Sequence, residues 1–164
     1  MMVIDLSQIE LRVNAWLAGQ ESVLTTLRTG GDVYSQMASR IYQLPITKAM
    51  GKSTHTVERF VGKTATLGCG YQCGGEKFTH MLRVAARRDG FKLQDESLEF
   101  GKRCVNEFRG DNPMIAAFWK ACEQALHVIA EGGSARLGPL EIFGGALVMP
   151  DGMQMIYPNL RWYE

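Results

Sequence analysis

Apolar residues recur at helical spacing along most of the chain and alternate only near its end. The first stripe consists of Ile9, Val13, Trp16 and Leu17, whose intervals of four, seven and eight residues are typical of one helix face. Gly19 follows as a stop signal, so we expect a helix from about residue 9 to residue 18. The apolar run at residues 2–4 predicts a short strand before it.

Similar stripes, each bounded by glycine, proline or a capping residue, predict the helices of the central region. They cover residues 21–28, 33–42, 56–67, 75–89 and 94–108, and the longest runs from Asn112-Pro113 to Gly132-Gly133. Asp32 is the expected N-cap of the helix at 33–42, and Pro45 follows its end. The stretch from Met50 to Thr56 is polar and is expected to be a loop.

The pattern changes after Ser134, where short apolar runs alternate with glycine and proline. Residues 147–149 and 155–157 flank Pro150-Asp151-Gly152, which predicts a β-hairpin. The sequence therefore predicts an α/β (α+β) chain that is mostly helical, with one early strand, a large helical middle and a β tail. We expect a single domain over residues 1–164.

Composition narrows the class of protein. Of 164 residues, 46% are hydrophobic and 21% charged, and the net charge is only +1, which argues weakly against a stand-alone DNA-binding protein. No apolar run approaches the roughly 18 residues that span a membrane, and no secretory leader opens the chain. The cysteines form no CxxC pair, so we expect reduced thiols in a cytoplasmic protein. A zinc site from Cys69 and Cys73 with His55 or His80 is a poorly spaced alternative.

The start of the chain combines a carboxylate with a helix N-terminus. Asp5 ends the apolar run and offers a hard oxygen ligand for a divalent cation. Ser7 is the expected N-cap, and Glu10 stands three residues later as in a capping box. Free N–H groups of a first helical turn receive phosphate oxygens. This arrangement indicates a site for a metal ion and a phosphate.

The octet from Asp5 to Arg12 also resembles motif A of the family A DNA polymerases. The family pattern is Asp-Tyr-Ser-Gln-Ile-Glu-Leu-Arg, and this chain departs from it only at Leu6, where tyrosine is usual. Seven matches in eight contiguous positions make the resemblance specific.

A second group of side chains follows Thr56 at strict fourfold spacing, namely Arg59, Lys63, Leu67 and Tyr71. Residues four apart share one helix face, and twelve residues span about 18 Å of helix. Two cations at one end suit a triphosphate. An apolar residue and an aromatic ring at the other end suit a sugar and a base.

This row resembles motif B of the same family, Arg-x3-Lys-x3-(Phe or Tyr)-Gly-x2-Tyr-Gly. Leu67 stands where an aromatic residue is usual, and Gln72 replaces the closing glycine. Asp5 and Arg59 are 54 residues apart, which suits the family interval. Between the two motifs, the segment Gly31–Tyr34 resembles Gly-x-Asp-x-His, with Tyr34 where histidine often contacts the triphosphate.

The resemblance implies a fold as well as a function. Family members have a right-hand fold of palm, fingers and thumb. In this chain it implies a palm strand and helix over about residues 1–20, the fingers over about 21–133, and a β return toward the palm over about 134–164. The segment Met149–Gly152 resembles a Leu-Pro-Ser-Gly-Arg stretch of phage members.

The resemblance also implies roles in template-directed nucleotidyl transfer from a deoxynucleoside triphosphate (dNTP) with two Mg²⁺ ions. Asp5 and the Leu6 carbonyl would bind metal, and the phosphates would be bound by Ser7, Gln8, Tyr34, Arg59 and Lys63. Lys63 would also donate a proton to the pyrophosphate. Glu10 would exclude a ribose 2′-hydroxyl, and Leu67 and Tyr71 would face the sugar and base.

The resemblance is partial, because no His-Asp pair of motif C occurs in the 164 residues. We therefore expect the motif C carboxylate and the thumb to come from a complementary fragment, with primer–template DNA as a further partner. The basic edge Arg83, Arg87 and Arg88 would touch template phosphates, or is only a solvated helix face. Two alternatives stay open for the whole chain: a non-catalytic module that binds nucleotide or DNA, and a helical scaffold.

Overall fold

The computed structural model describes residues 7–161. Within this range there are eight helices followed by a four-stranded antiparallel sheet, which confirms the mostly helical α/β class. The elements are α1 (Ile9–Ala18), α2 (Glu21–Arg28), α3 (Val33–Tyr42), α4 (Lys48–Gly51), α5 (Thr56–Cys69), α6 (Gly75–Asp89), α7 (Leu98–Asp111), α8 (Pro113–Ala130), β1 (Ala135–Leu137), β2 (Leu140–Phe143), β3 (Ala146–Val148) and β4 (Gln154–Ile156). The strand expected at residues 2–4 lies outside the described residues.

Most helix bounds agree with the sequence pattern, and the exceptions have local causes. Helix α5 continues past Gly68, whose bare backbone is packed against the Met81 side chain. Helix α7 begins four residues later than expected, because the Ser97 hydroxyl accepts a hydrogen bond from the Phe100 N–H and caps it there. The expected loop over 50–56 begins inside the one-turn helix α4, which Thr47 caps.

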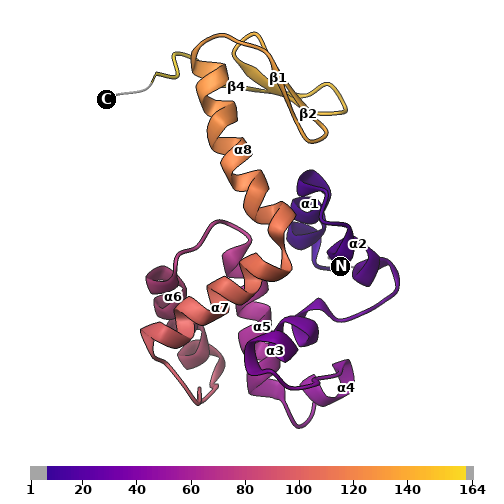
Figure 1. The fold of residues 1–164 in the computed structure, drawn as a ribbon, viewed down its shortest axis with the longest axis vertical. Helices are drawn as coiled ribbons and strands as arrows, with labels where there is room; N and C mark the ends of the chain where they lie inside the picture. The colour runs from indigo at the N-terminus through magenta and orange to yellow at the C-terminus, as the bar shows by residue number, and fades with distance from the viewer. Residues whose placement is uncertain (1–6, 162–164) are drawn as a thin grey trace, which may run out of the picture.

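Helices α3, α5, α6 and α7 form a helical body around the main core (Figure 1). Phe78, Phe108 and Ile115 are fully buried there. Helices α3 and α5 pack so closely that Gly62 of α5 lies directly against the Tyr34 carbonyl of α3. The four cysteines are free, and burial raises the pKa of the Cys69 thiol to about 12.

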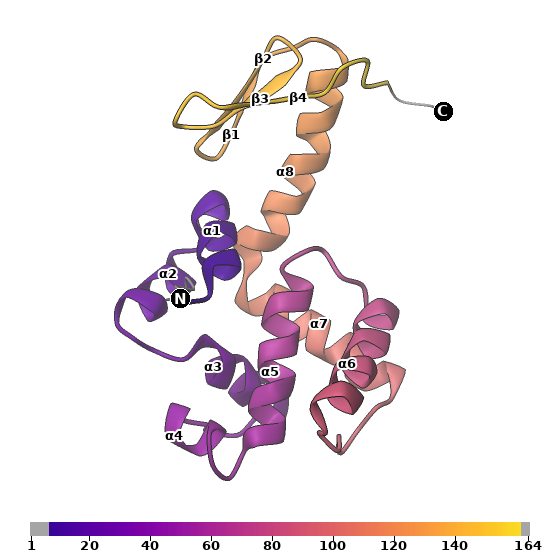
Figure 2. The same cartoon turned by 180° about the vertical axis from the view of Figure 1, so that it is seen from behind.

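Helix α8 leaves this body and carries the sheet at its far end, as the view from behind shows (Figure 2). The strand order is β1-β2-β3-β4, and β3 pairs with β4 across the predicted hairpin turn. Leu137, Leu140 and Ile142 of the sheet pack on Ala125 and Ile129 of α8 in a second core. Within residues 7–161, none of the helices is long and apolar enough to cross a membrane.

The first helix differs from its sequence pattern in two ways. Its N-cap is Gln8, in a left-handed conformation and without a capping side-chain hydrogen bond, so the predicted Ser7–Glu10 capping box is wrong. The buried face of α1 consists of Leu11, Ala15 and Ala18. The predicted inward stripe is instead turned outward, and Trp16 is 49% exposed rather than part of the core. Small residues let α1 approach its neighbours, which leaves the bulky stripe free to line a surface groove.

Candidate functional site

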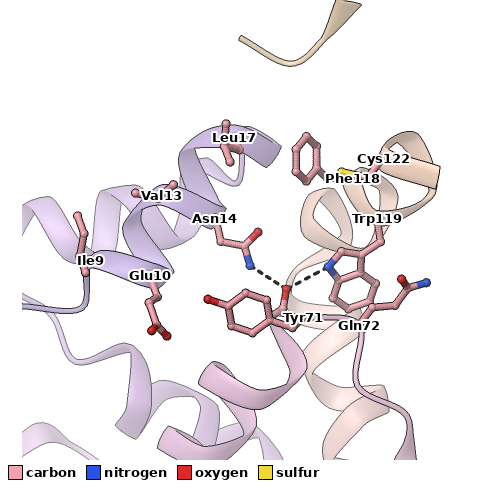
Figure 3. A pocket seen from close by; sticks show the side chains of 11 residues that line it. Ile9, Glu10, Val13, Asn14, Leu17, Tyr71, Gln72, Phe118, Trp119 and Cys122 are labelled. Carbon is pink, nitrogen blue, oxygen red and sulfur yellow. Dashed lines mark hydrogen bonds between the residues drawn. The ribbon is translucent and has the colours of Figure 1, made fainter. Parts of the chain in front are cut away.

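An apolar groove of about 600 Å³ lies between α1, the turn after α5 and α8 (Figure 3). Its lining comes from three segments that are far apart in the sequence: Ile9, Glu10, Val13, Asn14 and Leu17; Gly70, Tyr71 and Gln72; and Phe118, Trp119 and Cys122. Ile9, Val13 and Leu17 of the α1 stripe therefore form part of one wall. Tyr71, which is 71% exposed, projects its ring into the opening. Such a surface accepts a flat, partly apolar ligand group.

One backbone carbonyl connects the three walls of this groove. The Gly70 carbonyl accepts hydrogen bonds from Asn14 Nδ2 of α1 at 3.0 Å and from Trp119 Nε1 of α8 at 3.1 Å (Figure 3). The Trp119 ring also stacks on Phe108, with ring centroids 6.3 Å apart. The turn that carries Tyr71 is thus fixed from both sides.

A second, polar cavity of about 280 Å³ lies near the other end of α5. It is lined by Ser7, Gln8, Arg12, Leu27, Gly30, Gly31, Asp32, Lys48, Lys52 and Arg59. Residues at the start of α1 line both cavities, and α5 runs from Arg59 in the polar cavity to the turn at Gly70 that lines the groove.

The polar cavity contains a buried ion pair. Arg59 Nε donates to Asp32 Oδ2 at 2.7 Å and Arg59 Nη2 donates to Asp32 Oδ1 at 3.1 Å. The Ser35 hydroxyl donates to the same carboxylate at 2.7 Å. Asp32 is the N-cap residue of α3, as its sequence position predicts, but its side chain forms no capping hydrogen bond and binds Arg59 and Ser35 instead. Burial alone would raise the pKa of Asp32, but the hydrogen bonds from Arg59 and Ser35 and the charge of Arg59 outweigh it and lower the pKa.

Tyr34 extends this network to the start of α1. Its ring is buried, and the Arg59 guanidinium carbon lies 5.4 Å from its centroid, as in a cation–π contact. Burial raises the pKa of the Tyr34 phenol, while a hydrogen bond with the Gln8 side chain and the charge of Arg59 oppose the rise. The three predicted phosphate-binding residues Gln8, Tyr34 and Arg59 are therefore close together.

The structure separates the other members of the predicted row. Lys63 is exposed on α5 and lines neither cavity. Leu67 is half-buried and lines a small recess beside Glu10 and Tyr71. Tyr71 lies beyond the C-cap Gly70, so the expected single helical row of four residues is wrong at its last member. The row nevertheless leads from Arg59 at the polar cavity to Tyr71 at the groove.

The predicted metal ligands Asp5 and Leu6 lie outside the described residues. Among residues 7–161, no three side chains of His, Cys, Asp or Glu gather closely enough to hold a metal ion. The magnesium site therefore remains a prediction from the sequence.

The basic edge of α6 is partly engaged within the chain. Arg83 donates from Nε and Nη2 to the Glu96 carbonyl, and Arg88 pairs with Asp89 at 2.7 Å. Arg87 is exposed. Contact of these side chains with template phosphates stays a prediction.

Sequence reasoning assigned no role in the two cavities to Arg12, Lys48, Lys52, Asn14 and Trp119. Lys48 and Lys52 are four residues apart, a spacing typical of one helix face, but Lys52 lies in the stretch that the sequence predicts as a polar loop. Asn14 interrupts the polar-apolar pattern of α1, and Trp119 looks like an ordinary core aromatic in the sequence. Only the fold creates the polar cavity that the two lysines line and brings the Gly70 carbonyl to Asn14 and Trp119.

Comparison with known proteins gives a consistent result. A family model described as "DNA polymerase family A" matches residues 1–127. The DNA polymerase of Bacillus phage SP02 is 33% identical over 123 residues, which are 75% of this chain and 17% of that protein. DNA polymerase I of Mycobacterium tuberculosis is 28% identical over 62% of this chain and 11% of that protein. The thermostable DNA polymerase I of Thermus thermophilus is 29% identical over 51% of this chain and 10% of that protein. The chain thus spans at most about a sixth of these relatives.

Proposed function

The chain belongs to DNA polymerase family A, and on this premise we propose that it forms the part of a DNA-directed DNA polymerase that binds the incoming dNTP. The division into palm, fingers and β return at about residues 1–20, 21–133 and 134–164 belongs to this proposal. The reaction is proposed from the names of the relatives, and the place of the nucleotide is proposed from the positions of the two cavities.

The observation that carries the proposal is the polarity of the two cavities. Arg59, near the start of α5, faces a polar cavity rich in cations, whereas Tyr71, just after its end, faces an apolar groove. The helix from Arg59 to Cys69 rises by about 15 Å, and the turn after Gly70 carries Tyr71. A nucleoside triphosphate has a polyanion at one end and a flat aromatic base at the other, so its chemical polarity matches that of the site.

Individual roles follow from this placement. Ser7, Gln8 and Arg59 line the cavity at the phosphate end, and the buried Tyr34 ring lies against the Arg59 guanidinium. Lys63 is exposed on α5, one turn after Arg59, and would reach the phosphates only when a ligand lies along this helix. Its ammonium group is then available to donate a proton to the leaving pyrophosphate.

The groove end contributes selectivity for the sugar and the base. Glu10 lies beside Tyr71 in the wall of the groove and in the recess that Leu67 also lines. A carboxylate at this place would crowd a ribose 2′-hydroxyl, which favours a deoxyribose. Tyr71 offers a ring on which a base can stack.

The remaining parts of the reaction need further components. We propose that Asp5 and the Leu6 carbonyl contribute to a two-Mg²⁺ site that is completed by a motif C carboxylate of a complementary segment. Such ions lower the barrier by stabilising charge on the attacking and leaving oxygens. Primer–template DNA is the second substrate, and the exposed edge of α6 with Arg87 is the proposed place for template phosphates.

Nucleotide binding tests the proposal directly. We expect the chain to bind dATP more tightly than either inorganic tripolyphosphate or deoxyadenosine, because the nucleotide occupies both cavities. Tyr71→Ala should weaken dATP roughly tenfold, since stacking of a base contributes about 1–3 kcal/mol, without changing tripolyphosphate binding. Val84→Ala, at an exposed apolar position of α6, is the matched control. Equal affinity for dATP and tripolyphosphate would contradict the proposal.

Primer extension separates this function from that of a non-catalytic binding module. The chain is mixed with primer–template DNA, dNTP, Mg²⁺ and a fragment of a related family A polymerase that carries motif C. Extension that depends on both polypeptides supports the split-enzyme form of the proposal. Nucleotide binding without extension, under conditions where an intact relative extends the primer, supports the binding module.

A further inference from the structure

Cations outnumber carboxylates in the wall of the polar cavity. Arg12, Lys48, Lys52 and Arg59 line it together with a single acidic residue, Asp32. Because Asp32 holds Arg59 through two hydrogen bonds, these two charges compensate each other. The other three cations carry the excess positive charge of the cavity.

Two of these three cations, Lys48 and Arg12, are bound to backbone carbonyls and not to acids. Lys48 Nζ donates to the Gly30 carbonyl at 3.2 Å, and Arg12 Nε donates to the Ser7 carbonyl at 3.0 Å. Within residues 7–161, neither of them nor Lys52 forms an ion pair with a carboxylate. A lysine ammonium has three N–H donors and an arginine guanidinium has five. Each group therefore keeps donors for a further acceptor.

The short helix α4 holds the two lysines in place beside the ion pair. Thr47 caps α4 by accepting a hydrogen bond from the Met50 N–H. At Gly51 a Cβ atom would come within 2.6 Å of both Arg59 Cδ and Ser35 Oγ. The backbone of α4 therefore packs directly on the group that binds Asp32. Lys48 and Lys52 are four residues apart, flank this contact and line the same cavity.

We propose that Lys48, Lys52 and Arg12 form a polyphosphate-binding site that recognises the terminal phosphates of the nucleotide, while Arg59 is held by Asp32 as part of the cavity wall. The inference rests on the proposed function for the identity of the nucleotide. It differs from the motif-based assignment, because Lys48 and Lys52 lie in neither motif and Lys63 does not line this cavity. Three cations match the several negative charges of a triphosphate better than those of a monophosphate.

Calorimetric titration of the chain with inorganic tripolyphosphate at low salt tests the site without the nucleoside. Lys48→Ala/Lys52→Ala is compared with Lys92→Ala/Lys120→Ala, which removes the same charge from exposed positions outside the cavity. We expect the first pair to weaken tripolyphosphate binding roughly tenfold or more, since charge-assisted hydrogen bonds are lost. The control pair should change it by less than about twofold. All four lysines are exposed, so both variants should fold, which circular dichroism checks.

The outcomes separate this inference from the proposed function. If dATP binds and Tyr71→Ala weakens it, but the Lys48/Lys52 pair behaves like the control, the inference is wrong and the proposed function stands. If tripolyphosphate binds through Lys48 and Lys52 but dATP binds no more tightly, the polyphosphate site stands and the proposed function is wrong. Absence of binding by either ligand overturns both.

Discussion

The carboxylate of Asp32 is almost fully buried, and its acceptors serve the side chains of Arg59 and Ser35. A buried charge is tolerated only with such partners, because water no longer solvates it. The arginine is thereby fixed in a single orientation between α3 and α5, over the ring of Tyr34. Asp32 thus determines the orientation of the Arg59 guanidinium at the predicted phosphate end of the site.

Asp32→Asn should therefore destabilise the fold by about 3 kcal/mol, because it leaves a partly buried guanidinium without its counter-charge. The free energy of unfolding from urea titration measures this loss. Glu141→Gln, an exposed position on β2, is the control and should change stability by less than about 0.5 kcal/mol. Equal stability of the two variants would show that the ion pair contributes nothing.

The pH dependence of stability gives a separate test of the same carboxylate. The pKa of Asp32 in the folded chain is lowered below its ordinary value by Arg59 and Ser35, against the effect of burial. Its stabilisation is therefore fully present above the unfolded pKa, near about 4, and is lost as pH falls through the folded value. Wild-type stability should fall more steeply below about pH 4 than that of Asp32→Asn. Parallel curves would contradict the assignment.

At this scale the sequence predicted which residues lie close together better than it predicted their partners. Gln8, Tyr34 and Arg59 are close together, as the motif positions predict. The partner of Arg59 was not predictable, since Asp32 has an equally good local interpretation as a helix cap. Only the packing of α3 on α5 brings its carboxylate to the guanidinium, across 27 residues of sequence.

Among the elements, α3 and α5 have the most extensive contact, and Gly62 lets their backbones approach. A Cβ at this position would lie 2.3 Å from the Tyr34 carbonyl oxygen and 2.7 Å from the Ala38 nitrogen. Both are backbone atoms, so neither can move without shifting α3. The sequence bounds of α3 and α5 were nearly right, yet this glycine gave no signal inside an apolar helical pattern.

Gly62→Ala should cost about 3 kcal/mol or more, through overpacking of the two helices. Gly110→Ala in α7 is the control and should change the stability in the opposite direction, because nothing lies within 4 Å of its added Cβ. That change should stabilise the fold by about 0.5 kcal/mol, since alanine is the better helix former. Thermal unfolding of the two variants checks both signs, and equal shifts would rule out the steric argument.

The turn after α5 depends on donors from two other helices. Trp119→Phe keeps a ring for stacking on Phe108 but removes the N–H that donates to the Gly70 carbonyl. We expect a loss of about 1 kcal/mol and faster hydrogen exchange at residues 70–72, with α3 unaffected. Asn14→Leu removes the other donor and should have the same local effect. Unchanged exchange in both variants would show that neither donor holds the turn.

The whole molecule consists of a helical body and a sheet joined by α8 (Figure 1). The sheet also approaches α1 at one point, where Gly138 lies against the Leu17 carbonyl. Gly138 has φ of +58°, and an added Cβ would come within 2.5 Å of that oxygen. The contact links the end of α1 to the β1–β2 turn, 121 residues later in the sequence.

Gly138→Ala should therefore loosen the sheet from α1. Gly144→Ala is the matched control, because it has a similar φ of +60° but open space around the added Cβ. Both variants bear the strain of a left-handed alanine, about 1 kcal/mol, and only the first has the steric conflict. Limited proteolysis should cleave the region of residues 135–156 faster in Gly138→Ala. Equal cleavage rates would show that this contact does not hold the sheet.

At the molecular scale, composition and periodicity predicted a helical middle and a β tail, and the motifs predicted the family. They did not predict that the large apolar residues of α1 face outward. A stripe at helical spacing normally marks the buried face, but here Leu11, Ala15 and Ala18 form that face, and Ile9, Val13 and Leu17 of the stripe line the groove. Periodicity identifies a helix and its apolar side, whereas the neighbours decide which side is covered.

The groove also contains a cysteine thiol that can be labelled. Cys122 lines it and is half-buried, whereas Cys69, Cys73 and Cys104 are buried in the helical body. Thiol reagents react with accessible thiolates, so a maleimide dye should label this position in preference to the other three. The attached fluorophore would sit beside Trp119 and Tyr71, where its emission would report in real time whether a ligand has entered.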